Sequence, residues 1–211
     1  MKSNQFNKQW FKKHLTDPYV KLAQQQGFRS RAAYKLIMLD EKDRLFHKGQ
    51  KVLDLGAAPG AWSQFVKQQV GDQGEVCAID LLPLEPIPGV LCLQCDASDE
   101  AMLQQLYALR GLKPFDIVIS DMAPNLSGLA SIDQPRIHYL MKLALEIAAE
   151  VLKKKGCFLV KAFHGKGFDV YVQHLRTCFD RVVVRKPAAS RSGSSEVYLV
   201  AQGYQTSITK L

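Results

Sequence analysis

The chain has 211 residues, of which 47% are hydrophobic, so it is long enough to bury one substantial core without stabilising disulfides or metals. It has no apolar run of about eighteen residues and no apolar leader, which argues against a membrane-spanning or secreted protein. The formal net charge of +8 favours a polyanionic partner, and we expect a cytoplasmic protein.

The positive charge is concentrated in the first 35 residues. There, eight Lys or Arg residues stand against one acid, Asp17, for a net charge of +7, which leaves +1 for the other 176 residues. Aromatic residues such as Trp10 and Tyr19 are interleaved with these cations, a pattern typical of segments that bind nucleic acid by phosphate contacts and base stacking. The alternative is a solvated arm that only aids solubility.

From residue 30 the pattern becomes regular. Ser30 is a candidate N-cap for a helix that runs through Asp43. Asp133 ahead of Pro135 favours a helix start, and Gly156 after three lysines favours a helix end. The expected strands are 51–55, 75–80, 90–94, 115–120 and 157–162, and the expected helices are 61–70, 98–109, 135–153 and 168–177.

The alternation of these elements predicts an α/β fold, with a mostly parallel sheet and helices on both faces. The chain ends differently. The runs RVVVR (181–185) and EVYLVA (196–201) are separated by a polar loop that leaves no room for a crossover helix. We therefore expect these two strands to be antiparallel.

The stretch VLDLGAAPGAW (52–62) contains the first strand, its turn and the start of the next helix. Gly56 and Gly60 allow backbone to approach a ligand at the carboxyl end of the strand, where open parallel sheets bind nucleotides. A close-packed turn without a ligand is the alternative. The three-glycine fingerprint of nicotinamide enzymes is absent, so an oxidoreductase is a poor rival.

Acids follow successive predicted strands. They are Asp54, Asp80, Asp96 and Asp121. The acid after the second strand is placed to accept hydrogen bonds from ribose hydroxyls. Like charges crowded at one edge repel unless a ligand compensates them, and S-adenosylmethionine, with its sulfonium and amino group, suits such a rim.

Several motifs together carry a resemblance to a known family. VLDLGAAPGAW, the acids Asp80 and Asp96, SDMAPN (120–125), LVKAF (159–163) and SSEVYLV (194–200) resemble the FtsJ family of large-subunit ribosomal RNA 2′-O-ribose methyltransferases. The match runs from about residue 28 to 203. It implies the Rossmann-like, class I S-adenosylmethionine-dependent methyltransferase fold, with a seven-stranded sheet and an antiparallel last strand.

The resemblance also implies roles for single residues. Gly60 and Trp62 would line the methionine side of the cofactor, Asp80 would hold its ribose and Asp96 its adenine amino group, and Asp121 would lie near the methionine moiety. A catalytic tetrad would consist of Lys35, Asp121, Lys161 and Glu196.

The tetrad is chemically reasonable because a ribose 2′-hydroxyl is a weak nucleophile and needs a base. Lysines have a reference pKa of about 10.4; burial and a second ammonium lower it, and carboxylates raise it, so the sequence leaves the net direction open. Our hypothesis is that Lys161 is the base, Lys35 tunes it and contacts RNA, and Asp121 and Glu196 position the amines.

By resemblance, the substrate is a uridine in the A-loop of 23S ribosomal RNA within the 50S subunit. We divide the chain into a basic RNA-binding extension (1–29), a methyltransferase domain (30–203) and a tail (204–211), and we expect a monomer. The basic group of Arg181, Arg185, Lys186 and Arg191 would bind the RNA backbone. Three aromatic residues, Phe28, Tyr34 and Tyr198, could stack a base or pack in the core.

Other interpretations stay open. The tetrad would serve equally well in a 2′-O-methyltransferase that acts on transfer RNA or a messenger cap. DMAPN lacks the second proline and the aromatic of base-methylating enzymes, and an intact tetrad argues against a non-catalytic RNA-binding assembly factor. Cys92 and Cys95 form an isolated CxxC without a second ligand pair, so we expect no metal site.

Overall fold

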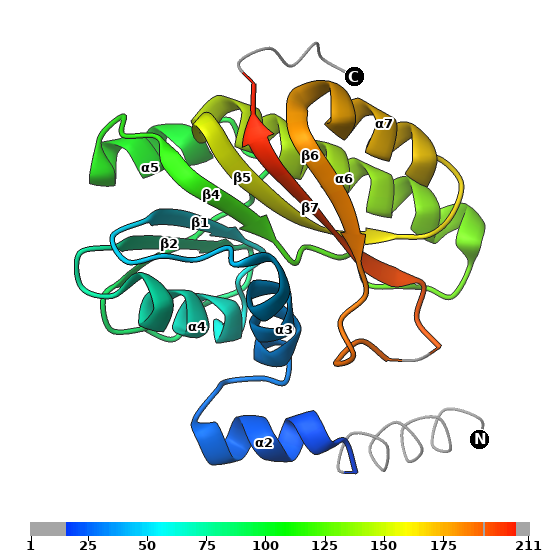
Figure 1. Ribbon diagram of the computed structural model, residues 1–211, viewed down its shortest axis with the longest axis horizontal. Coiled ribbons are helices and arrows are strands. Elements are labelled where there is room, and N and C mark those ends of the chain that lie inside the picture. The colour runs from blue at the N-terminus through cyan, green and yellow to red at the C-terminus, as the bar shows by residue number, and fades with distance from the viewer. Residues whose placement is uncertain (1–15, 192, 206–211) are drawn as a thin grey trace.

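The computed structural model describes residues 16–191 and 193–205. Within them, seven strands form one sheet in the order β3-β2-β1-β4-β5-β7-β6 (Figure 1). The neighbouring strands are parallel except in the two pairs that contain β7. The strands are β1 (Lys51–Leu55), β2 (Glu75–Asp80), β3 (Val90–Gln94), β4 (Phe115–Ser120), β5 (Leu152–Phe163), β6 (Phe179–Arg185) and β7 (Glu196–Tyr204). The predicted fold class is confirmed.

Helices cover both faces of the sheet (Figure 1). They are α2 (Pro18–Gln26), α3 (Ala33–Asp43), α4 (Ala61–Val70), α5 (Ala101–Arg110), α6 (Ala130–Val151) and α7 (Phe168–Cys178). One buried cluster joins the sheet to α5, α6 and α7, and a second joins it to α3 and α4. Helix α2 lies beyond α3, away from the sheet (Figure 1). No helix in the described part of the chain is long and apolar enough to cross a membrane.

Strand β1 shows how the sequence builds these two layers. Successive side chains of a strand point to opposite faces. Leu53 and Leu55 therefore pack in the cluster with α5 to α7, whereas Val52 packs in the cluster with α3 and α4. Asp54 shares the face of Val52 and meets Ser63 of α4. Both faces are buried, which explains the nearly continuous apolar runs of the parallel strands.

The basic extension contains an ordered helix. Helix α2 begins with Pro18 at its first position, and the Asp17 carboxylate accepts a hydrogen bond from the Tyr19 backbone N–H. It ends at Gly27, whose φ of +73° is the left-handed conformation that closes helices. Residues 1–15 lie outside the described residues.

The helix predicted at 135–153 was placed wrongly at both ends. It spans Ala130–Val151, because the Asp133 carboxylate accepts N–H groups of Ser127 and Gly128 and so organises the loop before the helix rather than capping a later start. Pro135 lies inside the helix and removes one hydrogen bond of its second turn.

The three lysines read as a helix end belong to strand β5, as does Gly156. Lys153 pairs with Asp116, and Lys155 with Asp180 at 2.8 Å. The three lysines form an irregular stretch of β5 between its pairings at Leu152 and Cys157, in which Lys155 has a left-handed φ of +62°.

Three smaller boundaries also shifted. The first predicted helix begins at Ala33, because the Ser30 hydroxyl accepts the N–H of Ala32 in the turn before it. The predicted helix 98–109 begins at Ala101, since Asp96 and Asp99 hold turns ahead of it. Strand β7 extends through Tyr204, whose hydroxyl donates to the Ala149 carbonyl.

Candidate active site

The four strand-end acids lie at one edge of the sheet. Strands β3, β2, β1 and β4 are neighbours and run parallel, so their carboxyl ends lie side by side. Asp80 ends β2, Asp96 and Asp121 follow β3 and β4, and Asp54 is the penultimate residue of β1. The sequence placed these carboxylates correctly.

The turn between β1 and α4 needs glycine at two positions. Gly56 has φ +74°, and a Cβ there would lie 2.7 Å from the Met122 side chain and 2.9 Å from the Met122 backbone nitrogen. Gly60 has φ +106°, and a Cβ there would lie 2.9 Å from the Arg29 guanidinium. Because both positions combine a left-handed φ with close neighbours, the turn packs tightly under the carboxyl edge.

Arg29 fixes this turn. Its guanidinium donates to the carbonyl of Pro59 at 3.1 Å, and to those of Glu85 and Pro86 at 2.7 and 2.8 Å. It therefore joins the turn after β1 to the segment after β2. The sequence counted Arg29 among the cations of the basic extension, but three backbone carbonyls already occupy much of its hydrogen-bonding capacity.

Two of the acids also organise the edge. Asp80 accepts the N–H of Ala58 through one oxygen and that of Leu82 through the other, both at 2.8 Å. Asp96 accepts the backbone N–H and the hydroxyl of Ser98, and these hydrogen bonds lower the pKa of its carboxyl. Each carboxylate is thus held in one orientation while its remaining lone pairs can accept from a ligand.

Asp54 is fully buried, and its environment is unusual. One oxygen accepts a hydrogen bond from the Ser63 hydroxyl at 2.5 Å, and the other is buried without a hydrogen-bond partner among the described residues. Burial raises the pKa of this carboxyl to about 7, and the charges of Asp121 and Asp80 add to the effect. Loss of hydration is thus the main reason that the ionised form of Asp54 is disfavoured, and the neighbouring acids add to it.

Trp62 lies mostly out of reach of a ligand. Its side chain is 3% exposed, its indole N–H donates to the Ala32 carbonyl at 2.8 Å, and its ring lies 5.7 Å from that of Tyr198. The side chain thus ties α4 to α3 in the core. Only the backbone of Trp62, in the first turn of α4, is left to line a site, as a helix N-terminus leaves N–H groups unpaired.

The predicted tetrad comes together as one chain of ion pairs. The Lys35 ammonium lies 2.7 Å from Glu196, and Lys161 lies 2.8 Å from the Asp121 carboxylate and 3.9 Å from Glu196. Lys161 also donates to the Asp121 backbone carbonyl at 3.0 Å. The four residues come from α3, the end of β4, β5 and β7. The antiparallel pairing of β5 with β7 sets Glu196 opposite Phe163, two residues beyond Lys161.

Two further residues belong to this group. The Tyr198 hydroxyl donates to Asp121 at 2.8 Å, and its ring lies 5.8 Å from the Lys35 ammonium. Burial, with the nearby carboxylates of Asp121 and Glu196, raises the phenol pKa well above 10, so it remains a donor. The Ser190 hydroxyl donates to Glu196 at 3.0 Å.

The base-stacking alternative for Tyr198 is wrong, because the ring is fully buried, and Tyr34 is also buried. Residues two apart in a strand share a face, so the spacing of Tyr198 and Glu196 could have predicted that Tyr198 lies near the tetrad. No local signal marked Ser190, which reaches Glu196 through the fold of a loop.

Arg185 has a structural partner. Its guanidinium forms two hydrogen bonds to the Asp43 carboxylate, at 2.8 and 2.7 Å, and the Asp43 side chain is almost completely buried. Of the basic group expected to bind RNA, Lys186 and Arg191 lie on the loop between β6 and β7, and Arg181 is exposed on β6. Arg185 instead fastens β6 to α3.

Among residues 16–191 and 193–205 there is no group of three or more His, Cys, Asp or Glu side chains that could hold a metal ion. A Rossmann-like sheet with an antiparallel last strand, a glycine turn under a rim of carboxylates and a lysine–carboxylate tetrad define a methyltransferase of the α/β class.

The comparisons with known proteins agree. Residues 28–204 match the family model of the FtsJ-like methyltransferases, and the chain belongs to this family. The sequence-based resemblance and the methyltransferase activity class are thereby confirmed.

Similar proteins include ribosomal RNA large subunit methyltransferase E of Hahella chejuensis, which is 52% identical over 196 residues covering 93% of this chain and 95% of that protein. The enzyme of the same name from Cellvibrio japonicus is 48% identical over 204 residues, 97% of each chain. Among solved structures, a Plasmodium falciparum protein assigned as a ribosomal RNA methyltransferase has a TM-score of 0.76 and 28% identity over 84% of this chain and 98% of its own.

The fibrillarin of Aeropyrum pernix, which was crystallised with natively bound S-adenosyl-L-methionine, shares the fold at a TM-score of 0.50 and 12% identity. The match covers 74% of this chain and 67% of that one.

Proposed function

We propose that this protein methylates the 2′-hydroxyl of a ribose in large-subunit ribosomal RNA, a uridine of the A-loop of 23S RNA. The family supplies the activity class, and the names of relatives about half identical to this chain support the substrate. The observation that carries the chemistry is the tetrad, in which Lys161 lies between two carboxylates at the carboxyl edge of the sheet.

The methyl donor is S-adenosyl-L-methionine, and the residues of the edge fit it. The donor is cationic, and the edge offers the carboxylates of Asp80, Asp96 and Asp121, while Asp54 adds a fully buried carboxyl with one oxygen that has no hydrogen-bond partner among the described residues. When bound, it supplies an electrophilic methyl group on a sulfonium. We assign its ribose to Asp80, its adenine amino group to Asp96, and its methionine end to Asp121, Gly60 and the backbone of Trp62.

Lys161 is the general base of this proposal. In its neutral form the amine accepts the proton of the attacking ribose hydroxyl. The ammonium that results lies 2.8 Å from Asp121 and 3.9 Å from Glu196, so two carboxylates stabilise the charge that develops during the reaction. Tyr198 donates to the same Asp121 oxygen that Lys161 contacts, and Lys35 and Ser190 hold Glu196.

Several finer assignments belong to the same proposal. The protein acts as a cytoplasmic monomer on the 50S particle, and its basic extension (1–29) contacts RNA. The tail expected at 204–211 begins only after Tyr204, because that residue is the last of β7. Phe28 is the one of the three aromatic candidates that remains partly exposed, so it alone keeps the base-stacking role.

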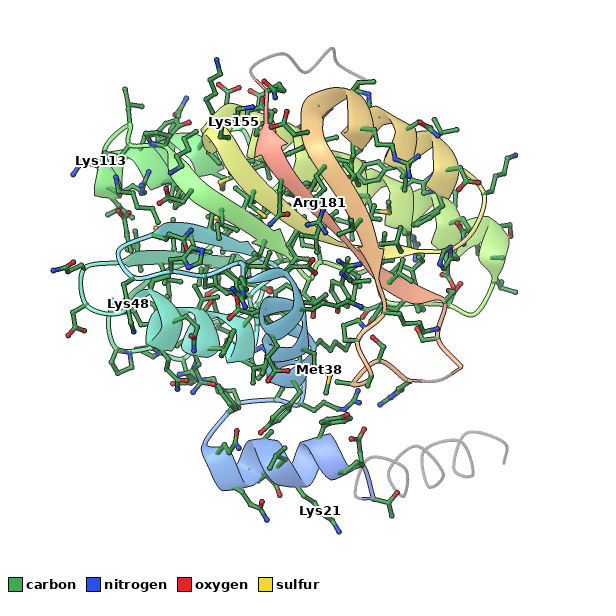
Figure 2. The ribbon with its side chains drawn as sticks, in the orientation of Figure 1. Lys21, Met38, Lys48, Lys113, Lys155 and Arg181 are labelled. Carbon is green, nitrogen blue, oxygen red and sulfur yellow. The ribbon has the colours of Figure 1, made fainter. Side chains whose placement is uncertain are left out.

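The test is methyl transfer from labelled S-adenosyl-L-methionine to unmodified 50S particles, naked 23S RNA and transfer RNA, with mapping of the methylated ribose. We expect label on an A-loop uridine. Lys161→Ala should lower kcat about 10²- to 10⁴-fold, the range for loss of a general base. Lys113→Ala, an exposed lysine on the turn before β4 (Figure 2), is the matched control.

Each result has a defined meaning. Label on transfer RNA alone would show that transfer RNA, and not ribosomal RNA, is the substrate. Label on no RNA would refute the proposed function. Unchanged kcat in Lys161→Ala would refute its role as the base. Binding of S-adenosyl-L-methionine by the variant, measured calorimetrically, separates loss of chemistry from loss of fold.

A further inference from the structure

We propose that a cavity between α2 and the loop joining β6 to β7 binds the nucleotide next to the methylated one, in single-stranded form. This inference rests on the proposed function and names a second subsite for its RNA. The cavity has a volume of about 640 Å³ and is lined by Asp17, Pro18, Tyr19, Arg31, Arg191, Gly193 and Ser194. It is open to solvent over much of its surface, so a nucleotide can reach it. Figure 1 shows α2 and this loop on the same side of the sheet.

The cavity combines an aromatic ring with cations. The Arg31 guanidinium lies 5.8 Å from the centre of the Tyr19 ring, and Arg191 is exposed at the opposite wall. Two arginines against Asp17 leave the lining with a net positive charge. A ring beside guanidinium groups is the combination that binds a nucleotide, because bases stack on aromatic faces while arginines meet phosphates.

Arg31 is fixed in place before any ligand arrives. Its Nε lies 2.8 Å from the Asp17 carboxylate, and one terminal nitrogen donates to the Ala189 carbonyl at 2.7 Å. A guanidinium has five N–H donors, so these two contacts leave others for a phosphate. The arginine thus joins α2 to the β6–β7 loop and keeps the two walls of the cavity together.

The cavity adjoins the tetrad through Ser194 of its lining, whose hydroxyl accepts the backbone N–H of Glu196 at 3.1 Å. The β6–β7 loop that forms one wall also carries Ser190, which holds Glu196. Arg31 lies four residues before Lys35, which pairs with the same carboxylate. A ribose presented to Lys161 therefore has its neighbour in the RNA strand within reach of this cavity.

A duplex does not suit this geometry. A base that stacks on Tyr19 must be unpaired and turned out of its helix, as in the single-stranded loops that proteins read in RNA. Lys21 on the outer side of α2 projects away from the sheet (Figure 2) and so extends the positive surface beyond the cavity.

Two substitutions test the aromatic ring of Tyr19 and the charge of Arg191 separately. Tyr19→Leu keeps an apolar side chain without a stacking face, and Arg191→Gln removes one exposed charge. Arg176→Gln, at an exposed residue in the last turn of α7, is the matched control for charge. Thermal melts of each variant confirm that the fold is retained.

We expect Tyr19→Leu to raise the KM for 50S particles about tenfold, within the range for loss of one base stack, with little change in kcat. Arg191→Gln should weaken binding of a labelled single-stranded RNA of A-loop sequence and lower the slope of log affinity against log salt by about 0.7, the value for one phosphate contact. Arg176→Gln should change neither quantity.

Equal RNA affinities for the wild type and both cavity variants would overturn the inference. An effect of Arg191→Gln without one of Tyr19→Leu would overturn the base-stacking part. Because the oligonucleotide assay measures binding directly, it separates the two proposals. RNA that binds in the cavity but is never methylated would contradict the proposed function and leave the subsite in place.

Discussion

Replacing Asp54 by Asn should change how stability depends on pH. Asp54 is buried with one oxygen unpartnered, and its pKa is raised from 3.8 to about 7. Between these two values the folded protein holds a proton that the unfolded chain has lost. The free energy of unfolding contributed by this group therefore falls as the pH rises towards 7.

The size of the effect follows from the two pKa values. Between pH 5 and pH 8, a carboxyl with a pKa of 3.8 unfolded and about 7 folded loses on the order of 2.5 kcal/mol of stabilisation. Asp54→Asn cannot ionise and lacks this loss. We therefore expect the free energy of unfolding of the variant, relative to that of the wild type, to rise by about 2.5 kcal/mol from pH 5 to pH 8, whatever the difference at pH 5.

The assay is urea unfolding of both proteins at pH 5, 6, 7 and 8 without cofactor, followed by circular dichroism. Taking the difference between the proteins cancels the titration of groups that they share. Asp72→Asn, in the exposed turn after α4, is the control and should run parallel to the wild type. A difference between wild type and Asp54→Asn that stays constant from pH 5 to pH 8 would refute the reasoning.

Two further substitutions test how the site is supported. Ser190→Ala removes one hydrogen bond to Glu196 and should lower kcat by up to about tenfold with the KM for RNA unchanged. Ser190→Thr should restore kcat. Equal kcat values for the wild type and Ser190→Ala would exclude a positioning role. Arg185→Met removes both short hydrogen bonds to the buried Asp43 carboxylate and leaves it Arg181 at 3.9 Å, so it should cost up to about 3–5 kcal/mol in urea unfolding. Arg185→Met combined with Asp43→Leu should recover much of this loss. A single variant as stable as the wild type would contradict that role for the pair.

The sequence predicted most of the edge because its geometry is local. An acid that follows a parallel strand lies at the carboxyl edge whatever the rest of the fold does, so Asp80, Asp96 and Asp121 could be placed from strand ends alone. The meeting of Lys35 with Glu196 could not be derived in this way. Residues from opposite ends of the chain form that pair, and only the family resemblance indicated it.

The errors arose where tertiary contacts outweighed local preference. The three lysines before Gly156 resemble a helix end, yet acids on β4 and β6 hold two of them in a strand. Arg29 and Arg185 were grouped with cations for RNA, but backbone carbonyls hold one and a buried carboxylate holds the other. A charge in a sequence does not show whether its partner lies inside the protein.

The reversed direction of β7 determines which of its residues reaches the tetrad. Because β7 runs against its neighbours, its first residue rather than its last reaches the working edge, and it brings Glu196 to Lys35 across most of the chain. Such a contact is strongly non-local, so forming it costs loop-closure entropy. The glycine turn and the three strand-end acids lie outside β7, whereas the carboxylate shared by the two lysines is the first residue of that strand. The two lysines thus depend on β7 for their common partner, although both lie in elements that precede it in the chain.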